Sequence, residues 1–132
     1  ALLLHLLRVL PLQLRSLPAD QGPGNLFTVE VHAEDVTEVF TGFGQRGTRA
    51  EAVADDAVQQ AKHYLAAGVP VGKCLADQLL VPMALSAGGT FVTQALTRHA
   101  STNIDVIRRF VDVEVTTEQA GGDRVVVRVI RK

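Results

Sequence analysis

The sequence has few of the features that would assign it to a simple class of protein. It has one cysteine, Cys74, in 132 residues, which excludes an internal disulfide bond and fits a reducing compartment such as the cytoplasm. It has no H-x-x-x-H or C-x-x-C spacing, so no structural metal site is predicted. The 13 basic side chains do not exceed the 14 acidic ones, which is not typical of sequence-independent nucleic-acid binding.

The apolar opening of the chain, ALLLHLLRVL at residues 1–10, is too short to span a bilayer and contains His5 and Arg8. It also lacks the basic leader of a signal peptide. A targeting segment and a buried helix both remain as interpretations, and the buried helix is favoured. We expect no membrane association. Because the chain starts with Ala rather than Met, we expect a fragment of a longer protein.

The composition is that of one ordinary globular domain, with 47% apolar and 20% charged residues. Apolar periodicity and turn residues predict helices and strands in alternation, followed by a hairpin. The predicted elements are a strand at 12–17, a loop at 17–25, a strand at 27–31, helices at 50–65 and 73–86, a strand at 91–96, a helix capped by Thr102, and a hairpin over 113–129. This order predicts an α+β fold, a mixed four-stranded sheet with helices packed on one face.

Residues 42–47, GFGQRG, match the G-x-G-x-x-G pattern of a dinucleotide-binding turn and precede a predicted helix. The preceding EDVTEVFT is too acidic and irregular for a buried parallel strand. No acidic residue for a ribose stands about twenty residues beyond the motif. We therefore interpret the motif as a glycine loop, which places Arg46 and Arg49 near a helix N-terminus that could meet an anion.

Asp77 and Gln78 lie near the start of the predicted second helix, which is otherwise apolar. They are either solvated residues that complement the helix dipole or a polar pair aimed at a ligand. Cys74, four residues before Gln78, has no histidine near it in sequence, and the residues alone favour a small buried side chain there.

His99 stands two residues before the run Ser101, Thr102 and Asn103, which are all good helix caps. The unpaired backbone N–H groups of a helix start favour a phosphate, and a neutral imidazole beside a phosphate can act as a nucleophile. From position alone, a surface or capping histidine and a nucleophile both remain possible.

Three segments resemble the RNA 3'-terminal phosphate cyclases: GPGN at 22–25, EDVTEVFTGFGQRG at 34–47, and the stretch from Leu75 to Phe110 with its ADQL, RH and TNI motifs. The resemblance covers nearly the whole chain and implies the C-terminal portion of that family. It implies a repeated four-stranded, two-helix unit like the C-terminal domain of translation initiation factor three. Residues 1–25 would then be a flanking helix, strand and loop, and residues 26–132 the main α+β unit of a single catalytic-domain fragment.

The resemblance also implies an activity: ATP-dependent conversion of an RNA 3'-phosphate to a 2',3'-cyclic phosphate, with His99 as the nucleophile that carries AMP. The matching ATP-binding stretch is Cys74, Leu75, Ala76, Asp77 and Gln78. An aromatic residue often stands in the family where this chain has Cys74, so Phe40 and Phe43 become candidate neighbours of the base.

The expected partners are RNA 3'-phosphate ends, ATP and a missing N-terminal part of the same protein. The divalent metal of the family, Mg or Mn, would find its ligands in that missing part, so the isolated chain is expected to be inactive. Two alternatives remain: a non-catalytic cyclase-like protein of RNA processing or ribosome assembly, and a plain α+β RNA-binding or interaction module. The second requires Arg98, Arg108 and Arg109 to gather on one face with Arg46.

Overall fold

The structure is a computed structural model that describes residues 13–16, 18, 20 and 24–132. The predicted helix at residues 1–10 lies outside the described residues. The predicted strand at 12–17 is not confirmed, because residues 13–16 are exposed and form neither helix nor strand. None of the described helices is long and apolar enough to cross a membrane.

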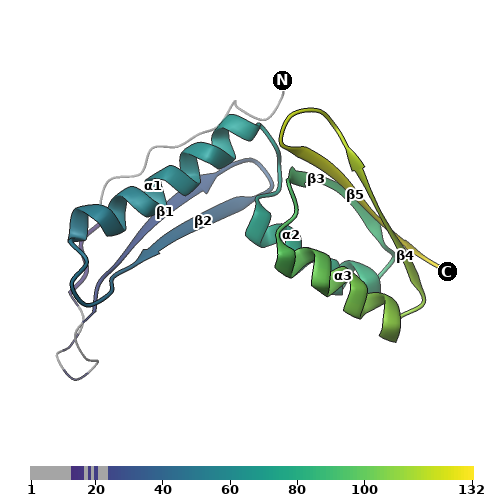
Figure 1. Cartoon of the computed structure of the whole chain (residues 1–132), viewed down its shortest axis with the longest axis horizontal. Helices are drawn as coiled ribbons and strands as arrows, with labels where there is room; N and C mark the ends of the chain where they lie inside the picture. Colours follow the sequence, from purple (N-terminus) through teal and green to yellow (C-terminus); the bar gives the residue numbers. More distant parts are fainter. Residues whose placement is uncertain (1–12, 17, 19, 21–23) are drawn as a thin grey trace. The chain divides into compact units, whose positions relative to one another are not determined.

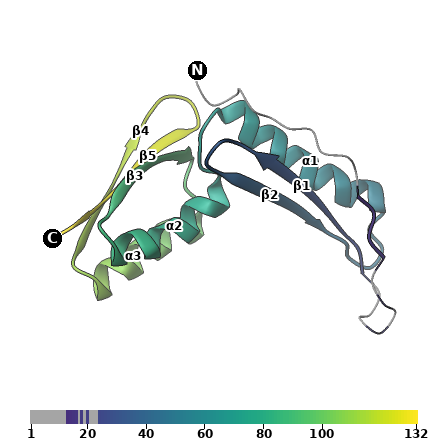
Figure 2. The same cartoon turned by 180° about the vertical axis from the view of Figure 1, so that it is seen from behind.

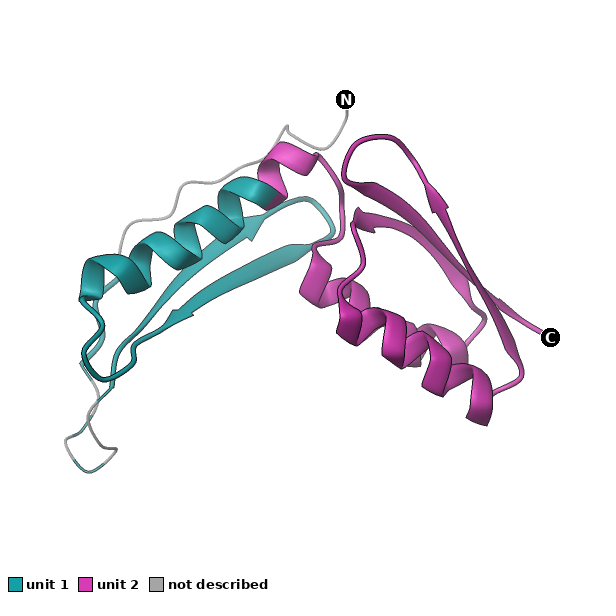
Figure 3. Cartoon of the chain, in the orientation of Figure 1, with its two compact units in different colours: residues 1–63 teal, residues 64–132 magenta. Residues whose placement is uncertain are grey.

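The chain divides into two compact units, residues 1–63 and 64–132 (Figure 3). In the first unit, strands β1 (Leu26–His32) and β2 (Thr37–Phe43) form an antiparallel hairpin. Helix α1 (Ala50–Ala67) starts in this unit and ends in the second. Its buried residues Val53, Ala57 and Ala61 follow at intervals of four and form one face of the helix. The predicted strand at 27–31 and helix at 50–65 are thus confirmed.

Strand β2 is a segment that the sequence patterns did not predict, because its charged residues argued against a buried strand. Its alternation is nevertheless regular: Glu38, Phe40 and Gly42 are buried, and the residues between them are more exposed. The strand pairs with β1 from Leu26 opposite Phe43 to His32 opposite Thr37. The partner of β1 therefore comes from the next segment of the chain rather than from the C-terminal half.

The second unit contains an antiparallel sheet with the order β3-β5-β4. Its elements are α2 (Lys73–Leu85), β3 (Gly89–Gln94), α3 (Arg98–Phe110), β4 (Val113–Gln119) and β5 (Arg124–Arg131). Both helices lie on the same face of this sheet, side by side (Figures 1 and 2). The predicted second helix, third strand and final hairpin are confirmed, with ends that differ by a few residues.

The expectation of an α+β fold is confirmed, but a mixed four-stranded sheet is not what forms. The described residues instead form a two-stranded and a three-stranded antiparallel sheet. The parallel pairing that a mixed sheet requires is limited to one isolated bridge, between Val71 and Thr93. Pro70 directly before Val71 and the start of α2 at Lys73 leave little chain for a longer strand at this edge.

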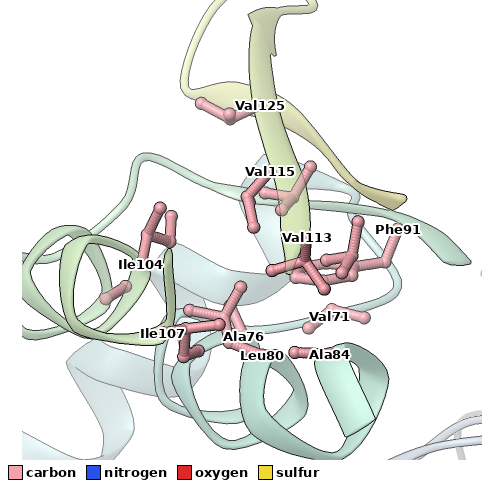
Figure 4. Close-up of a cluster of buried hydrophobic side chains, with 13 residues drawn as sticks. Val71, Ala76, Leu80, Ala84, Phe91, Ile104, Ile107, Val113, Val115 and Val125 are labelled. Atoms are coloured by element: carbon pink, nitrogen blue, oxygen red, sulfur yellow. The ribbon is translucent and has the colours of Figure 1, made fainter. Parts of the chain in front are cut away.

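The second unit has one hydrophobic core between the helices and the sheet (Figure 4). The helices contribute Ala76, Leu80, Ala84, Ala100, Ile104 and Ile107, and the strands contribute Phe91, Val113, Val115, Val125, Val127 and Val129. These strand residues alternate with exposed ones such as Glu114 and Arg128, so one face of the sheet is covered by the helices. This core fixes the two helices that carry the candidate site.

Candidate functional site

His99 lies inside the first turn of α3, not before the helix. The helix begins at Arg98, and Thr97 is its N-cap: the Thr97 hydroxyl oxygen accepts a hydrogen bond from the Ala100 backbone N–H at 3.1 Å. The Thr97 carbonyl accepts the first main-chain bond, from Ser101, at 3.0 Å. His99 is therefore the second helical residue, with an exposed side chain. It still lies at the end of the helix where backbone N–H groups and the macrodipole favour an anion.

The predicted cap at Thr102 is thus wrong by five residues. Ser101, Thr102 and Asn103 all have cap chemistry, but the apolar stripe of the helix starts before them. Ala100 is fully buried, and Ile104 and Ile107 continue the same face. Burying Ala100 against the sheet requires helical geometry from Arg98 onward, so packing determines where the helix begins.

The position of the cap can be tested by comparing two threonines in the same helix. We expect Thr97→Ala to destabilise the start of α3 by about 1 kcal/mol, because the Ala100 N–H loses its acceptor. Hydrogen exchange of the α3 peptide should then rise by roughly fivefold. Thr102→Ala removes an exposed hydroxyl within the helix and should change stability by about 0.5 kcal/mol or less. The opposite order of effects would restore Thr102 as the cap.

The second candidate segment, Cys74 to Gln78, forms the first turn and a half of α2. Its N-cap residue, Gly72, is extended and provides no side-chain cap hydrogen bond. Ala76 is buried in the core and Leu75 packs against it. Of the five predicted nucleotide-binding residues, Cys74, Asp77 and Gln78 therefore present side chains away from the core. Spacings of three and four residues place these three on one side of the helix.

The structure corrects the expectation of a buried Cys74 and refines that of a solvated Asp77. The cysteine is exposed, since it stands on the side of α2 opposite to Ala76 and Leu80. Asp77 is only half-buried, and its carboxylate has a partner on the neighbouring helix.

The parallel bridge between Val71 and Thr93 brings the two candidate segments to the same end of the second unit. Helix α2 starts two residues after Val71, and α3 starts five residues after Thr93. Both helices therefore begin at the carboxyl ends of adjacent parallel segments and run back over the sheet side by side (Figures 1 and 2).

A pair of hydrogen bonds joins the two segments directly. The Asn103 side-chain amide donates to the Asp77 carboxylate oxygen Oδ1 at 2.9 Å and to the Asp77 backbone carbonyl at 3.2 Å. Asn103 stands four residues after His99, so both lie on the same side of α3. Asp77 belongs to the predicted nucleotide-binding stretch. The sequence singled out Asn103 as a candidate helix cap and as part of the TNI motif, but not as a partner of Asp77.

Two of the three glycines of residues 42–47, Gly42 and Gly44, have a packing role in the first unit. A Cβ atom on Gly42 would lie 2.0 Å from the backbone oxygen of Val53, so α1 crosses the hairpin in close contact at this point. A Cβ atom on Gly44 would lie 1.5 Å from the side-chain oxygen of Asn25. The motif begins inside an antiparallel hairpin strand, β2, rather than after the parallel strand of a dinucleotide-binding unit. The sequence-based interpretation as a glycine loop therefore fits better than a dinucleotide site.

Two further features concern metal ligands and the arginines of the RNA-binding alternative. Within the part of the chain that the structure describes, no group of three or more His, Cys, Asp or Glu side chains could hold a metal ion. Arg108 donates to the backbone oxygen of Val115 and lies 3.5 Å from the Asp105 carboxylate, so its charge is partly engaged within the unit. Arg108 is therefore less available to contact phosphates, which argues against a nucleic-acid surface made of Arg98, Arg108 and Arg109.

Comparison with known proteins gives consistent matches. A family profile described as RNA 3'-terminal phosphate cyclase matches residues 8–117. A protein of that name from Ectopseudomonas mendocina is 50% identical over 99 residues, which are 75% of this chain and 29% of the relative. One from Ralstonia nicotianae is 46% identical over 115 residues, 87% of this chain and 33% of the relative. One from Salmonella paratyphi C is 44% identical over 101 residues, 76% of this chain and 29% of the relative. The matched region thus spans about a third of the length of these curated relatives.

Proposed function

Because this chain belongs to the RNA 3'-terminal phosphate cyclase family, we propose that it supplies the nucleophilic part of an enzyme that forms RNA 2',3'-cyclic phosphate ends. The enzyme would use ATP and act on RNA that ends in a 3'-phosphate. His99 would be the nucleophile, and the stretch from Cys74 to Gln78 would bind the nucleotide.

The observation that carries the proposal is the shared position of these two segments. His99 is exposed in the first turn of α3, and Cys74, Asp77 and Gln78 line one side of the first turns of α2. The Asn103–Asp77 hydrogen bonds join the two helices between them. A phosphate beside His99 would meet the free N–H groups and the positive dipole end of α3, which stabilise charge on phosphoryl oxygens.

The proposed reaction consists of three displacements at phosphorus. An imidazole nitrogen of His99 attacks the α-phosphorus of ATP, the bond to the bridging oxygen breaks, and pyrophosphate leaves. An oxygen of the RNA 3'-phosphate then attacks the same phosphorus, the P–N bond breaks and the imidazole is released. Finally the terminal 2'-hydroxyl loses its proton and attacks the RNA phosphorus, which expels AMP. A covalent intermediate divides one difficult dehydration into steps with good leaving groups.

Several parts of this enzyme would lie outside the chain. A divalent ion, Mg or Mn, supplies charge neutralisation in phosphoryl transfer, and the described residues offer no ligand group for it. Its ligands would belong to the remaining part of the protein, as would further contacts to ATP. We therefore expect the 132 residues alone to be inactive, and the enzyme to act in the cytoplasm, where its RNA and ATP are available.

The proposed function can be tested with RNA of two kinds. A full-length protein that contains this chain, given ATP and Mg²⁺ or Mn²⁺, should convert a 3'-phosphate oligonucleotide to a phosphatase-resistant product lighter by one water. An oligonucleotide with a 2'-deoxy terminal nucleotide should accept AMP without cyclising, because it lacks the attacking hydroxyl. A folded protein that leaves both RNA ends unchanged would favour a non-catalytic role.

A further inference from the structure

The two helices of the candidate site lie parallel and begin at the same end of the sheet, so their spacing at that end needs a specific support. At this end the fully buried residues of the two helices are small: Ala76 in α2 and Ala100 in α3. Alanines allow close approach but fix the position of two helices less tightly than large interlocking side chains. A polar contact at the same level can therefore determine how α2 sits against α3.

Asn103 provides such a contact with two bonds to one residue. Its Nδ2 group reaches both the Oδ1 atom and the backbone oxygen of Asp77, at 2.9 Å and 3.2 Å. One bond fixes the rotamer of the Asp77 carboxylate, and the other fixes the backbone of α2 at that residue. A slide or rotation of α2 relative to α3 would lengthen both hydrogen bonds. Both residues are half-buried, so water competes only in part for these bonds.

We propose that Asn103 is a positioning residue for adenylyl transfer, which holds the nucleotide-binding stretch of α2 in register with His99 on α3. This inference rests on the proposed function. Asn103 would act through Asp77 and through the spacing of the helices rather than by touching the reacting phosphorus. Displacement of bound ATP by about 1 Å relative to a nucleophile can lower the rate of a reaction by about 100-fold.

Variants of Asn103 should show a slower rate of AMP attachment rather than a loss of stability. We expect Asn103→Ala and Asn103→Asp, made in a full-length protein, to slow AMP attachment at saturating ATP by roughly 100-fold. The ATP concentration for half-maximal attachment should change much less, since the other nucleotide contacts remain. A merely structural residue would instead lower the thermal midpoint and reduce attachment only in proportion to the unfolded fraction.

The aspartate variant adds a signature in pH. Asn103→Asp places a second carboxylate where the amide stood 2.9 Å from Asp77 Oδ1, and two like charges at that distance repel. Protonation of one of the pair restores an O–H donor. The rate of Asn103→Asp relative to the parent at the same pH should therefore rise as the pH falls from 8 toward about 5. Asn103→Ala should show no such recovery.

Gln60 offers a matched control in another helix. Its side-chain amide donates to the Asp56 carboxylate at 3.0 Å on the exposed side of α1, so Gln60→Glu makes the same chemical change outside the candidate site. We expect Gln60→Glu to attach AMP at the parental rate. Attachment at the parental rate by folded Asn103→Ala and Asn103→Asp would overturn the inference alone. A folded parent that accepts no AMP would overturn the proposed function, and the inference with it.

Discussion

Replacement of His99 with alanine in a full-length protein that contains this chain is expected to abolish the covalent attachment of AMP. The imidazole is exposed at the second position of α3, so its loss would remove the proposed nucleophile without opening a cavity in the core. Alanine is also a good helix former at this position. Removal of a nucleophile from a group-transfer enzyme lowers the rate by a factor on the order of 10³ or more. Intact-protein mass spectrometry after incubation with ATP and a divalent ion measures the adduct directly.

Three controls make the His99 result specific. His63→Ala changes another exposed histidine, in α1, and should retain the adduct. A phosphoramidate is labile to acid and stable to base, so the parental adduct should be lost at low pH, whereas an AMP ester of a hydroxyl should be more stable there. Unchanged hydrogen exchange of the α3 peptide would show that His99→Ala is folded. An adduct that persists on folded His99→Ala would place the nucleophile at another residue.

Sequence patterns predicted most elements of the fold because their periodicity agrees with their packing. Helix α1 shows its buried face as Val53, Ala57 and Ala61, and β5 shows its buried face as alternating valines. Strand β2 was missed since Glu38 occupies an inward position with an exposed fraction of only 4%. A carboxylate at a core position normally argues against a strand, and only the tertiary fold reveals that it is buried.

The candidate site was predictable in its parts but not in its assembly. His99 and Asp77 were singled out by chemistry and by resemblance. The start of α3 was predicted too late because three consecutive residues have cap chemistry, and the burial of Ala100 decides among them. The Asn103–Asp77 contact joins residues 26 positions apart. No helical or strand spacing predicts such a pairing, since it depends on how two separate helices pack on one sheet.

The anchoring of α2, which carries the proposed nucleotide-binding stretch, should depend on a single large core residue. Leu80 is fully buried between the helices and the sheet, two residues after Gln78. Leu80→Ala is expected to destabilise this unit by about 3 kcal/mol, because it loses buried apolar contact and leaves a cavity. Leu85, in the same helix, is 63% exposed, and Leu85→Ala should cost about 0.5 kcal/mol or less.

Hydrogen exchange of peptides is the suitable measurement for the two leucines, since a longer protein with several units need not unfold in one step. A loss of about 3 kcal/mol corresponds to roughly 100-fold faster exchange of protected amides in α2 and β3. Peptides from β1 and β2 serve as an internal reference. If Leu80→Ala and Leu85→Ala accelerate exchange equally, the core does not hold α2 in place. In that case the alignment of Cys74, Asp77 and Gln78 with His99 would have to depend on the Asn103 bonds alone.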